Sequence, residues 1–204
     1  MAEFVLFNPD IHSDDNNQLL LEHRLNTTER MKKNHQIDLE KLVGPIDEYV
    51  QNEMKTHVTY KPPEEVMLFI IVDGEAAGMG RISKIREDAG EIKQMYNRPK
   101  YRGKGYAKMM LRKLMDEGRK LGYSTYLLDV WKLGHSARHI YTSAGFTEIE
   151  RYPESRSPSF MAPYYTFMEK RENEVYSNPT RGNKSSTTTY RSRRCSYSTS
   201  QTKR

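Results

Sequence analysis

The segment RPKYRGKGYAKMML, residues 98–111, places two glycines and several basic residues directly before a helical pattern. Apolar side chains then recur three or four positions apart, as on one face of an amphipathic helix, which predicts a helix over 104–121. Apolar strand patterns flank this helix at 90–96 and 124–130. A strand, a glycine turn, a helix and a second strand predict a crossover unit, which belongs in an α/β or α+β fold.

The rest of the body predicts a mixed central β-sheet flanked by helices. Strands over 65–72 and 78–85 form a predicted hairpin around Asp73-Gly74, and the strand at 90–96 extends it into an antiparallel meander. The other predicted elements are a strand over 3–8, a helix over 15–33, a helical pattern over 38–57 that Gly44-Pro45 interrupts, a helix over 134–144, and strands over 146–152 and 164–170.

The net charge of +6 comes from the C-terminal end of the chain. Residues 171–204 hold eight of the 33 Lys and Arg and two of the 27 Asp and Glu, so residues 1–170 are neutral overall. This Ser/Thr/Arg-rich end has almost no aliphatic residues and cannot offset an ordering cost of about 1–2 kcal/mol per residue. We expect one domain over 1–170 and a disordered basic tail over 171–204.

Several classes of protein and site are not expected. The most apolar stretch is far shorter than the roughly 20 residues of a membrane span, so we expect no membrane partner. The N-terminus lacks a basic segment leading into an apolar one, and the single cysteine, Cys195, can form neither a disulfide framework nor a Cys-rich zinc site. We therefore expect a cytoplasmic protein without a bound metal.

The glycine turn fits neither of two common phosphate-binding motifs. Tyr106 follows Gly103-Lys104-Gly105 where a P-loop needs Ser or Thr, and Lys108 stands where a dinucleotide fingerprint has its third glycine. A glycine turn at a helix start is nevertheless suited to a diphosphate, because free N–H groups and the helix dipole face the anion. The glycines alone fit equally well a tight turn beside a solvated basic face.

The region around this turn resembles the GNAT N-acetyltransferase superfamily. The matching segments are GEIKQMYNRPKYRGKGYAKMML, YLLDV and ARHIYTSAGF, which occur in the family's order and spacing over roughly residues 66–151. The resemblance implies a GNAT-type acyl-CoA N-acyltransferase fold and acetyl-CoA as co-substrate. This sequence departs from the family pattern at Lys100, where the family usually has Gln or Arg, and at Gly134, where an Asn is common.

The resemblance also implies cofactor-binding residues. The pantetheine arm would run between splayed parallel strands at 90–96 and 124–130, and a backbone N–H near Met95 or Tyr96 would polarise the thioester carbonyl. The backbone of the glycine turn would hold the diphosphate, through Arg102, Gly103, Lys104, Gly105, Tyr106 and Ala107.

Two residues are catalytic candidates by the same resemblance. A primary amine has a pKa of about 10, so it must lose a proton before it can attack. Glu91 matches the family's strand carboxylate, which would take that proton. Tyr141 matches the acid that protonates the leaving thiolate. Glu91 could instead be an exposed charge at a strand edge, and Tyr141 a packing aromatic. His135 could be a second proton carrier, but it is interpreted as a helix cap or surface residue. Asp129 and Trp131 are interpreted as structural residues.

The function that follows is direct acetyl transfer from acetyl-CoA to a primary amine of a small molecule or peptide. The alternative is a non-catalytic acyl-CoA-binding module whose basic tail recruits a partner. Nucleic acid would bind only through residues 172–204, and a homodimer stays open. The substrate loops, expected at 15–60 and 153–163, carry no decodable pattern; acidic residues at 38–53 could attract a cationic amine or be solvated.

Overall fold

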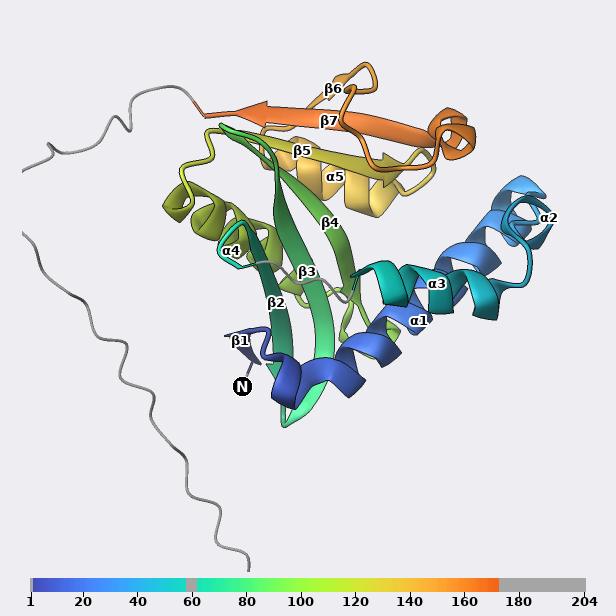
Figure 1. The fold of residues 1–204 in the computed structure, drawn as a ribbon, viewed down its shortest axis with the longest axis horizontal. Coiled ribbons are helices and arrows are strands. Elements are labelled where there is room, and N and C mark those ends of the chain that lie inside the picture. Colours follow the sequence, from blue (N-terminus) through green and yellow to red (C-terminus); the bar gives the residue numbers. More distant parts are fainter. Residues whose placement is uncertain (1, 58–61, 173–204) are drawn as a thin grey trace, which may run out of the picture. The chain divides into compact units, whose positions relative to one another are not determined.

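A computed structural model describes residues 2–57 and 62–172 of the 204-residue chain. Its centre is a seven-stranded sheet with the strand order β1-β2-β3-β4-β5-β7-β6 (Figure 1). The strands are β1 (Ala2–Leu6), β2 (Glu65–Val72), β3 (Glu75–Arg86), β4 (Ala89–Asn97), β5 (Thr125–Trp131), β6 (Thr147–Ile149) and β7 (Tyr165–Arg171). The helices are α1 (Pro9–His35), α2 (Glu40–Val43), α3 (Ile46–His57), α4 (Tyr106–Lys120) and α5 (His135–Ser143), with 3₁₀ turns η1 (Pro99–Tyr101) and η2 (Ser159–Tyr164).

The predicted mixed sheet and crossover unit are confirmed. β1 to β4 form an antiparallel series, β4 and β5 are parallel, and α4 connects them. The parallel pairing runs from Ala89 with Thr125 to Ile92 with Leu128 and ends there. Figure 1 shows β4 and β5 diverging beyond the paired segment. The sheet is therefore opened at its centre, on the side toward which both strands run.

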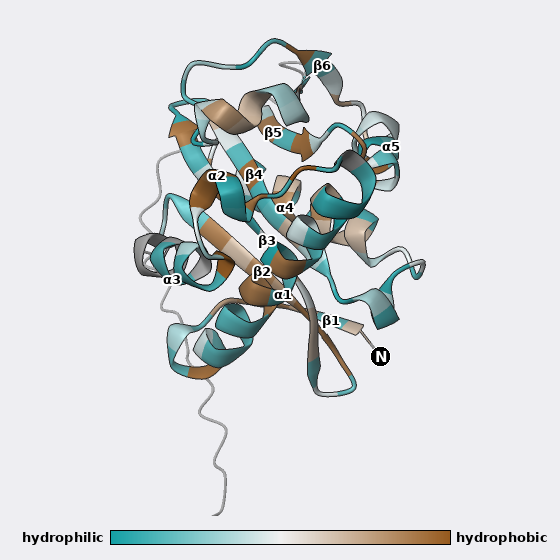
Figure 2. Ribbon diagram, turned by 90° about the vertical axis from the view of Figure 1, so that its right-hand side faces the viewer, coloured by the Kyte–Doolittle hydropathy of each residue, from teal (hydrophilic) through white to brown (hydrophobic). Residues whose placement is uncertain are grey.

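Helices cover both faces of the sheet, which explains the unbroken apolar run of β2. Leu68 and Ile70 pack in the cluster that contains α4, whereas Met67 and Phe69 pack against Leu20 of α1 in a second cluster. Successive strand residues point to opposite faces, so a strand covered on both sides needs apolar residues throughout. Figure 2 shows this distribution, with the hydrophobic colour concentrated in the strands and the helices mostly hydrophilic.

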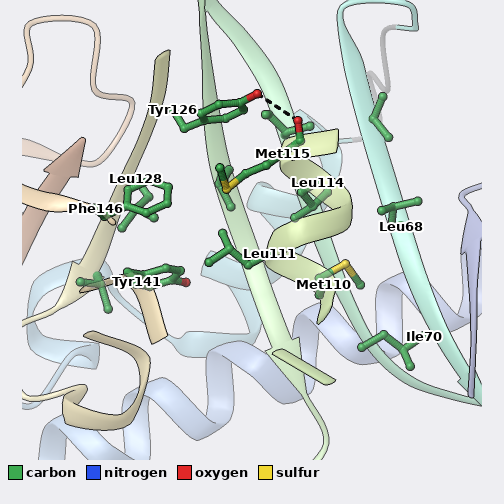
Figure 3. Packing of buried hydrophobic residues seen from close by; sticks show 14 of the residues in the cluster. Leu68, Ile70, Met110, Leu111, Leu114, Met115, Tyr126, Leu128, Tyr141 and Phe146 are labelled. Carbon is green, nitrogen blue, oxygen red and sulfur yellow. Dashed lines mark hydrogen bonds between the residues drawn. The ribbon is translucent and has the colours of Figure 1, made fainter. Parts of the chain in front are cut away.

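The largest core cluster lies between α4, α5 and the sheet. Met110, Leu111 and Leu114 of α4 are buried there, and the Tyr126 hydroxyl donates to the carbonyl of Met115 at 2.9 Å (Figure 3). This packing fixes α4, and with it the glycine turn at its start.

Three predicted boundaries are wrong. α1 begins at Pro9 and not at 15, because the Asn8 side chain caps it by accepting from the Asp10 N–H at 2.9 Å, with proline in the first turn. The same cap ends the first strand at Leu6, before the predicted 8. The strand predicted over 146–152 is only β6, because the chain leaves the sheet and buries the Tyr152 side chain.

The predicted tail over 171–204 lies, apart from its first two residues, outside the described part of the chain. β7 ends at Arg171, and the Glu172 N–H donates to the Ser124 carbonyl at 2.8 Å. Within residues 2–57 and 62–172, no helix combines the length and apolar character needed to cross a membrane.

Gly118 lets α4 approach the sheet closely, which gives a stability prediction. A Cβ at this position would lie 2.7 Å from Tyr126 Cε1 and 2.9 Å from Ile82 Cδ1. We expect Gly118→Val to lower the free energy of unfolding by about 1–3 kcal/mol, the usual cost of overpacking. Urea unfolding measures this, with Met109→Val, at an exposed position of the same helix, as the control for helix propensity. Equal stability of the two variants would contradict the packing.

Candidate active site

A cavity of about 1150 Å³ lies at the opening between β4 and β5. Its walls come from β3, β4 and β5, from α1 to α3, from the start of α4, from α5, and from the segment around η2. Both halves of the sequence-predicted site line it: Gly103 and Gly105 on one side, Tyr141 on another. Because β4 and β5 diverge here, residues from both faces of the sheet line the same cavity.

The glycine turn has the backbone that only glycine adopts without strain. Gly103 has φ +76° and Gly105 has φ +80°, both left-handed, and Gly105 is the cap from which α4 starts. Gly105 has no side chain that could accept from the first amides of α4, and these amides point out of the N-terminal end of the helix. With the Asn97 amide in its better-satisfied orientation, its oxygen accepts from the Ala107 N–H at 3.2 Å.

The basic residues of the turn divide into two groups. Arg102 and Lys108 line the cavity, and Arg102 is held by the Asn97 carbonyl at 3.1 Å and by the ring of Tyr96, 5.8 Å from its guanidinium. Lys100 instead pairs with Glu75 and lies outside the cavity lining. The Lys104 ammonium lies 5.4 Å from the centre of the Tyr101 ring, and Lys104 is outside the cavity lining.

A bulge in β4 lies where the thioester-polarising amide was expected. Met79 pairs with Tyr96 and Arg81 with Lys93, so β4 has one more residue than β3 between these pairs. Gln94 within the bulge has φ +54°. The bulge turns this part of β4 out of the regular ladder, and residues 92–97 line the cavity.

Tyr141 has features of both sequence interpretations. It is 8% exposed, packs edge-on against Phe146 with ring centres 5.9 Å apart, and lies in the α4–α5 cluster (Figure 3). Its hydroxyl nevertheless reaches the cavity side and contacts Met95 Sδ at 3.6 Å. Burial, and secondly the charge of Asp129, raise the pKa of Tyr141 above the usual phenol value. The hydroxyl therefore stays protonated and can donate.

Glu91 is buried, so the interpretation as an exposed strand-edge charge is wrong. Its side chain is 0% exposed, and it accepts a hydrogen bond from the Tyr152 hydroxyl at 2.6 Å. Lys93 Nζ lies 3.3 Å from the same carboxylate oxygen. Lys93 lines the cavity and Glu91 lies behind it, outside the set of lining residues. Burial and the nearby Glu91 charge raise the pKa of Tyr152.

The cavity-facing carboxylate is Asp129, which the sequence interpretation left as structural. Ser157 Oγ donates to Asp129 Oδ2 at 2.7 Å, and Lys93 Nζ lies 3.6 Å from that oxygen. The register of β4 with β5 explains why Lys93 and Asp129 are neighbours. Glu91 pairs with Leu127, and two residues further along each strand, on the same face, Lys93 lies opposite Asp129. A charged residue near the end of an otherwise uncharged strand was the available signal. Trp131 and His135 also line the cavity.

The Tyr152–Glu91 contact gives a second stability prediction. Removing the hydroxyl leaves a buried carboxylate without this donor, so we expect Tyr152→Phe to cost about 1–3 kcal/mol. Unfolding of Tyr152→Phe, Glu91→Gln and the double variant measures the coupling between the two residues, expected at about 0.5–3 kcal/mol. Strictly additive losses would show that the hydrogen bond does not form in solution.

Within the described ranges, no group of three or more His, Cys, Asp or Glu side chains is arranged to hold a metal ion.

Comparison with known proteins decides the family. The model of the acetyltransferase (GNAT) family matches residues 31–146, more than half of the chain. The chain belongs to the GNAT family. An uncharacterized N-acetyltransferase of Schizosaccharomyces pombe is 28% identical to this GNAT protein over 118 residues, 56% of this chain and 69% of the relative. Matches to four curated relatives, all named as N-acetyltransferases, span 56–69% of those proteins' own lengths.

Solved structures show the same fold. A GNAT acetyltransferase from Staphylococcus aureus superimposes with a TM-score of 0.62 at 17% identity, covering 84% of this chain and 99% of the other. The PaiA N-acetyltransferase from Thermoplasma acidophilum, crystallised with coenzyme A, gives a TM-score of 0.59 at 15% identity, with coverage of 84% and 99%. The predicted GNAT-type fold is therefore confirmed.

Proposed function

We propose that this GNAT protein is an acetyl-CoA-dependent N-acetyltransferase that transfers acetyl directly to a primary amine. The observation that carries the proposal is one cavity that joins the glycine turn, the β4 bulge and the Tyr141 hydroxyl. Membership of the family and the coenzyme A bound to its PaiA neighbour support the choice of co-substrate. Residues 1–170 would form the catalytic domain in a cytoplasmic protein, with 171–204 as an appendage.

The residues of the cavity fit acetyl-CoA. The amides of residues 103–106, at the turn and the start of α4, would hold the diphosphate, aided by the charges of Arg102 and Lys108. Of the other two expected amides, that of Arg102 donates to the Pro99 carbonyl at 3.1 Å and that of Ala107 to the Asn97 side chain at 3.2 Å. A volume of about 1150 Å³ accommodates a ligand at or above the usual size for small-molecule sites. Acetyl-CoA supplies the activated acetyl thioester, and the amides of Met95 or Tyr96 would stabilise negative charge on its carbonyl oxygen.

Tyr141 has the properties of the acid. Its phenol is protonated, faces the cavity, and can donate to a sulfur, as its contact with Met95 Sδ illustrates. Protonation of the leaving thiolate by a positioned acid lowers the barrier of the transfer.

Asp129 is the carboxylate placed to receive the acceptor's ammonium proton. It lines the cavity, whereas Glu91 reaches that space only through Lys93. We therefore propose that Glu91, with Tyr152, positions Lys93 and so sets the charge beside Asp129. Glu91 as a direct base would need a water chain through this cluster.

The test is release of free thiol from acetyl-CoA by the purified full-length chain in the presence of amines, amino acids, polyamines and peptides. We expect thiol release that depends on an amine and yields its N-acetyl product. Binding of acetyl-CoA without transfer to any acceptor would favour the non-catalytic acyl-CoA-binding module.

A further inference from the structure

The part of the cavity formed by α1 to α3 and η2 contains an apolar pocket. Trp131 stacks on Tyr164 with ring centres 5.8 Å apart and meets the edge of Tyr165 at 5.5 Å. The apolar lining residues here are Leu39, Val43, Ile46, Tyr49, Trp131, Met161 and Tyr165. Such a surface binds a bulky apolar group, and nothing in the proposed binding of acetyl-CoA uses it.

Beside this pocket, acidic and basic side chains form a row across three neighbouring strands. Arg81 of β3 pairs in register with Lys93 of β4, and Lys93 contacts Asp129 of β5. Neighbouring strands are about 4.8 Å apart, so the three side chains lie close together on one face of the sheet. Trp131 follows Asp129 on that face.

Asp129 is the only Asp or Glu among the described residues that line the cavity. Seven lining residues are Lys or Arg. The exposed acidic side chains of α2 and α3, Glu40, Asp47 and Glu48, do not line it, so the predicted attraction of a cationic acceptor by residues 38–53 is not supported. A polycationic amine would meet one favourable charge and many repulsive ones.

Two arginines, Arg81 and Arg156, line the cavity next to the row. Arg81 is buried and paired with Glu65 at 2.8 Å, and burial together with the nearby charge of Arg156 lowers its pKa. Arg156 lines the cavity and donates to the Lys84 carbonyl, a neutral acceptor, at 3.2 Å. Glu65 and Glu91 lie behind the wall and pair with Arg81 and Lys93, whereas Arg156 is exposed at the cavity and can bind an anion there.

We propose that the acceptor is a free amino acid with a bulky apolar side chain. Its ammonium lies at Asp129, its carboxylate at the cluster of Arg81, Lys93 and Arg156, and its side chain in the apolar pocket. This inference rests on the proposed function and names its substrate class.

The transfer balances without further reactants. The ammonium loses one proton toward Asp129, the amine nitrogen forms a bond to the acetyl carbon, and the carbon–sulfur bond breaks. The sulfur takes a proton from Tyr141 and the nitrogen releases its second proton, which restores Tyr141 through solvent. The products are the N-acetyl amino acid, coenzyme A as its thiol, and one proton.

The experiment compares acceptors that differ in one group, using the full-length chain and acetyl-CoA. L-Phenylalanine is compared with phenethylamine, which lacks the carboxylate, with L-phenylalaninamide, with glycine, which lacks the side chain, and with spermidine. We expect kcat/KM for L-phenylalanine to exceed that of each other acceptor by about 10-fold or more. For phenethylamine and L-phenylalaninamide this is the effect of a lost charge-assisted contact, and for glycine that of the lost apolar burial.

Variants assign the effect to the site. Arg156→Gln should lower kcat/KM for L-phenylalanine about 10-fold and leave phenethylamine unchanged, whereas the control Arg112→Gln, exposed on α4, should change neither. A kcat/KM for phenethylamine or spermidine equal to that for L-phenylalanine would overturn the inference while leaving the acetyltransferase function intact. A preference for L-phenylalaninamide would overturn it in favour of a peptide N-terminus. Transfer to no acceptor would overturn both proposals.

Discussion

Replacing Tyr141 by Phe is expected to lower kcat about 10²–10⁴-fold, the usual contribution of a positioned general acid. The substitution removes only the hydroxyl and keeps the ring that packs against Phe146. Because burial raises the pKa of Tyr141, the wild-type hydroxyl should act as an acid throughout the neutral and mildly alkaline range. Steady-state kinetics with a thiol-detecting reagent measures kcat, and calorimetry checks that affinity for acetyl-CoA is retained.

Tyr123→Phe is the matched control for this loss. Tyr123 is also buried, and its hydroxyl donates to the Glu64 carbonyl at 3.1 Å, outside the cavity lining. The Tyr123→Phe variant should have a lower free energy of unfolding and an unchanged kcat. An unchanged kcat in Tyr141→Phe would contradict the acid role, and a wild type that binds acetyl-CoA without transfer would indicate the binding module.

Gly105→Val is expected to weaken acetyl-CoA binding about 100-fold. The left-handed conformation at φ +80° costs an L-residue about 1–2 kcal/mol, and a β-branched residue more. A Cβ here has open space within 4 Å, so the change acts by reorienting the amides at the start of α4, on the cavity side. Isothermal titration calorimetry with acetyl-CoA measures the loss.

The control is Gly74→Val in the β2–β3 hairpin. Gly74 has φ +83° and equally open surroundings, but it lies outside the cavity lining, so both variants carry a comparable backbone strain. Only Gly105→Val should lose affinity. Equal affinities in the two variants would show that the turn does not hold the ligand.

The fold was predictable from the sequence where local pattern and tertiary packing agree. The helical spacing of α4 and the hairpin at Asp73-Gly74 both stand in the structure close to their predicted ranges. The start of α1 was missed because the potential capping residues at 14–17 are typical of a helix start, whereas Asn8 and Pro9 form the actual one. The early end of β6 depends on burial of Tyr152 against Phe167, a contact between distant segments that no local pattern encodes.

The site was predictable in its motif and not in its charges. Gly103, Gly105 and Tyr141 follow from the resemblance to the GNAT pattern, and the structure brings them to one cavity. The positions of Glu91 and Asp129 depend on which face of each strand turns toward the opening, and that depends on the register of β4 with β5. The pairing of Lys100 with Glu75, which stands 25 residues away in the hairpin, likewise depends on tertiary packing.

The most direct test of the central claim is an NMR titration of the ¹⁵N-labelled full-length chain with coenzyme A. If the main-chain amides of the turn hold the diphosphate, the signals of Gly103, Gly105 and Tyr106 should shift most and that of Gly74 should stay in place. Binding of coenzyme A that moves other amides and leaves these three unchanged would contradict the account.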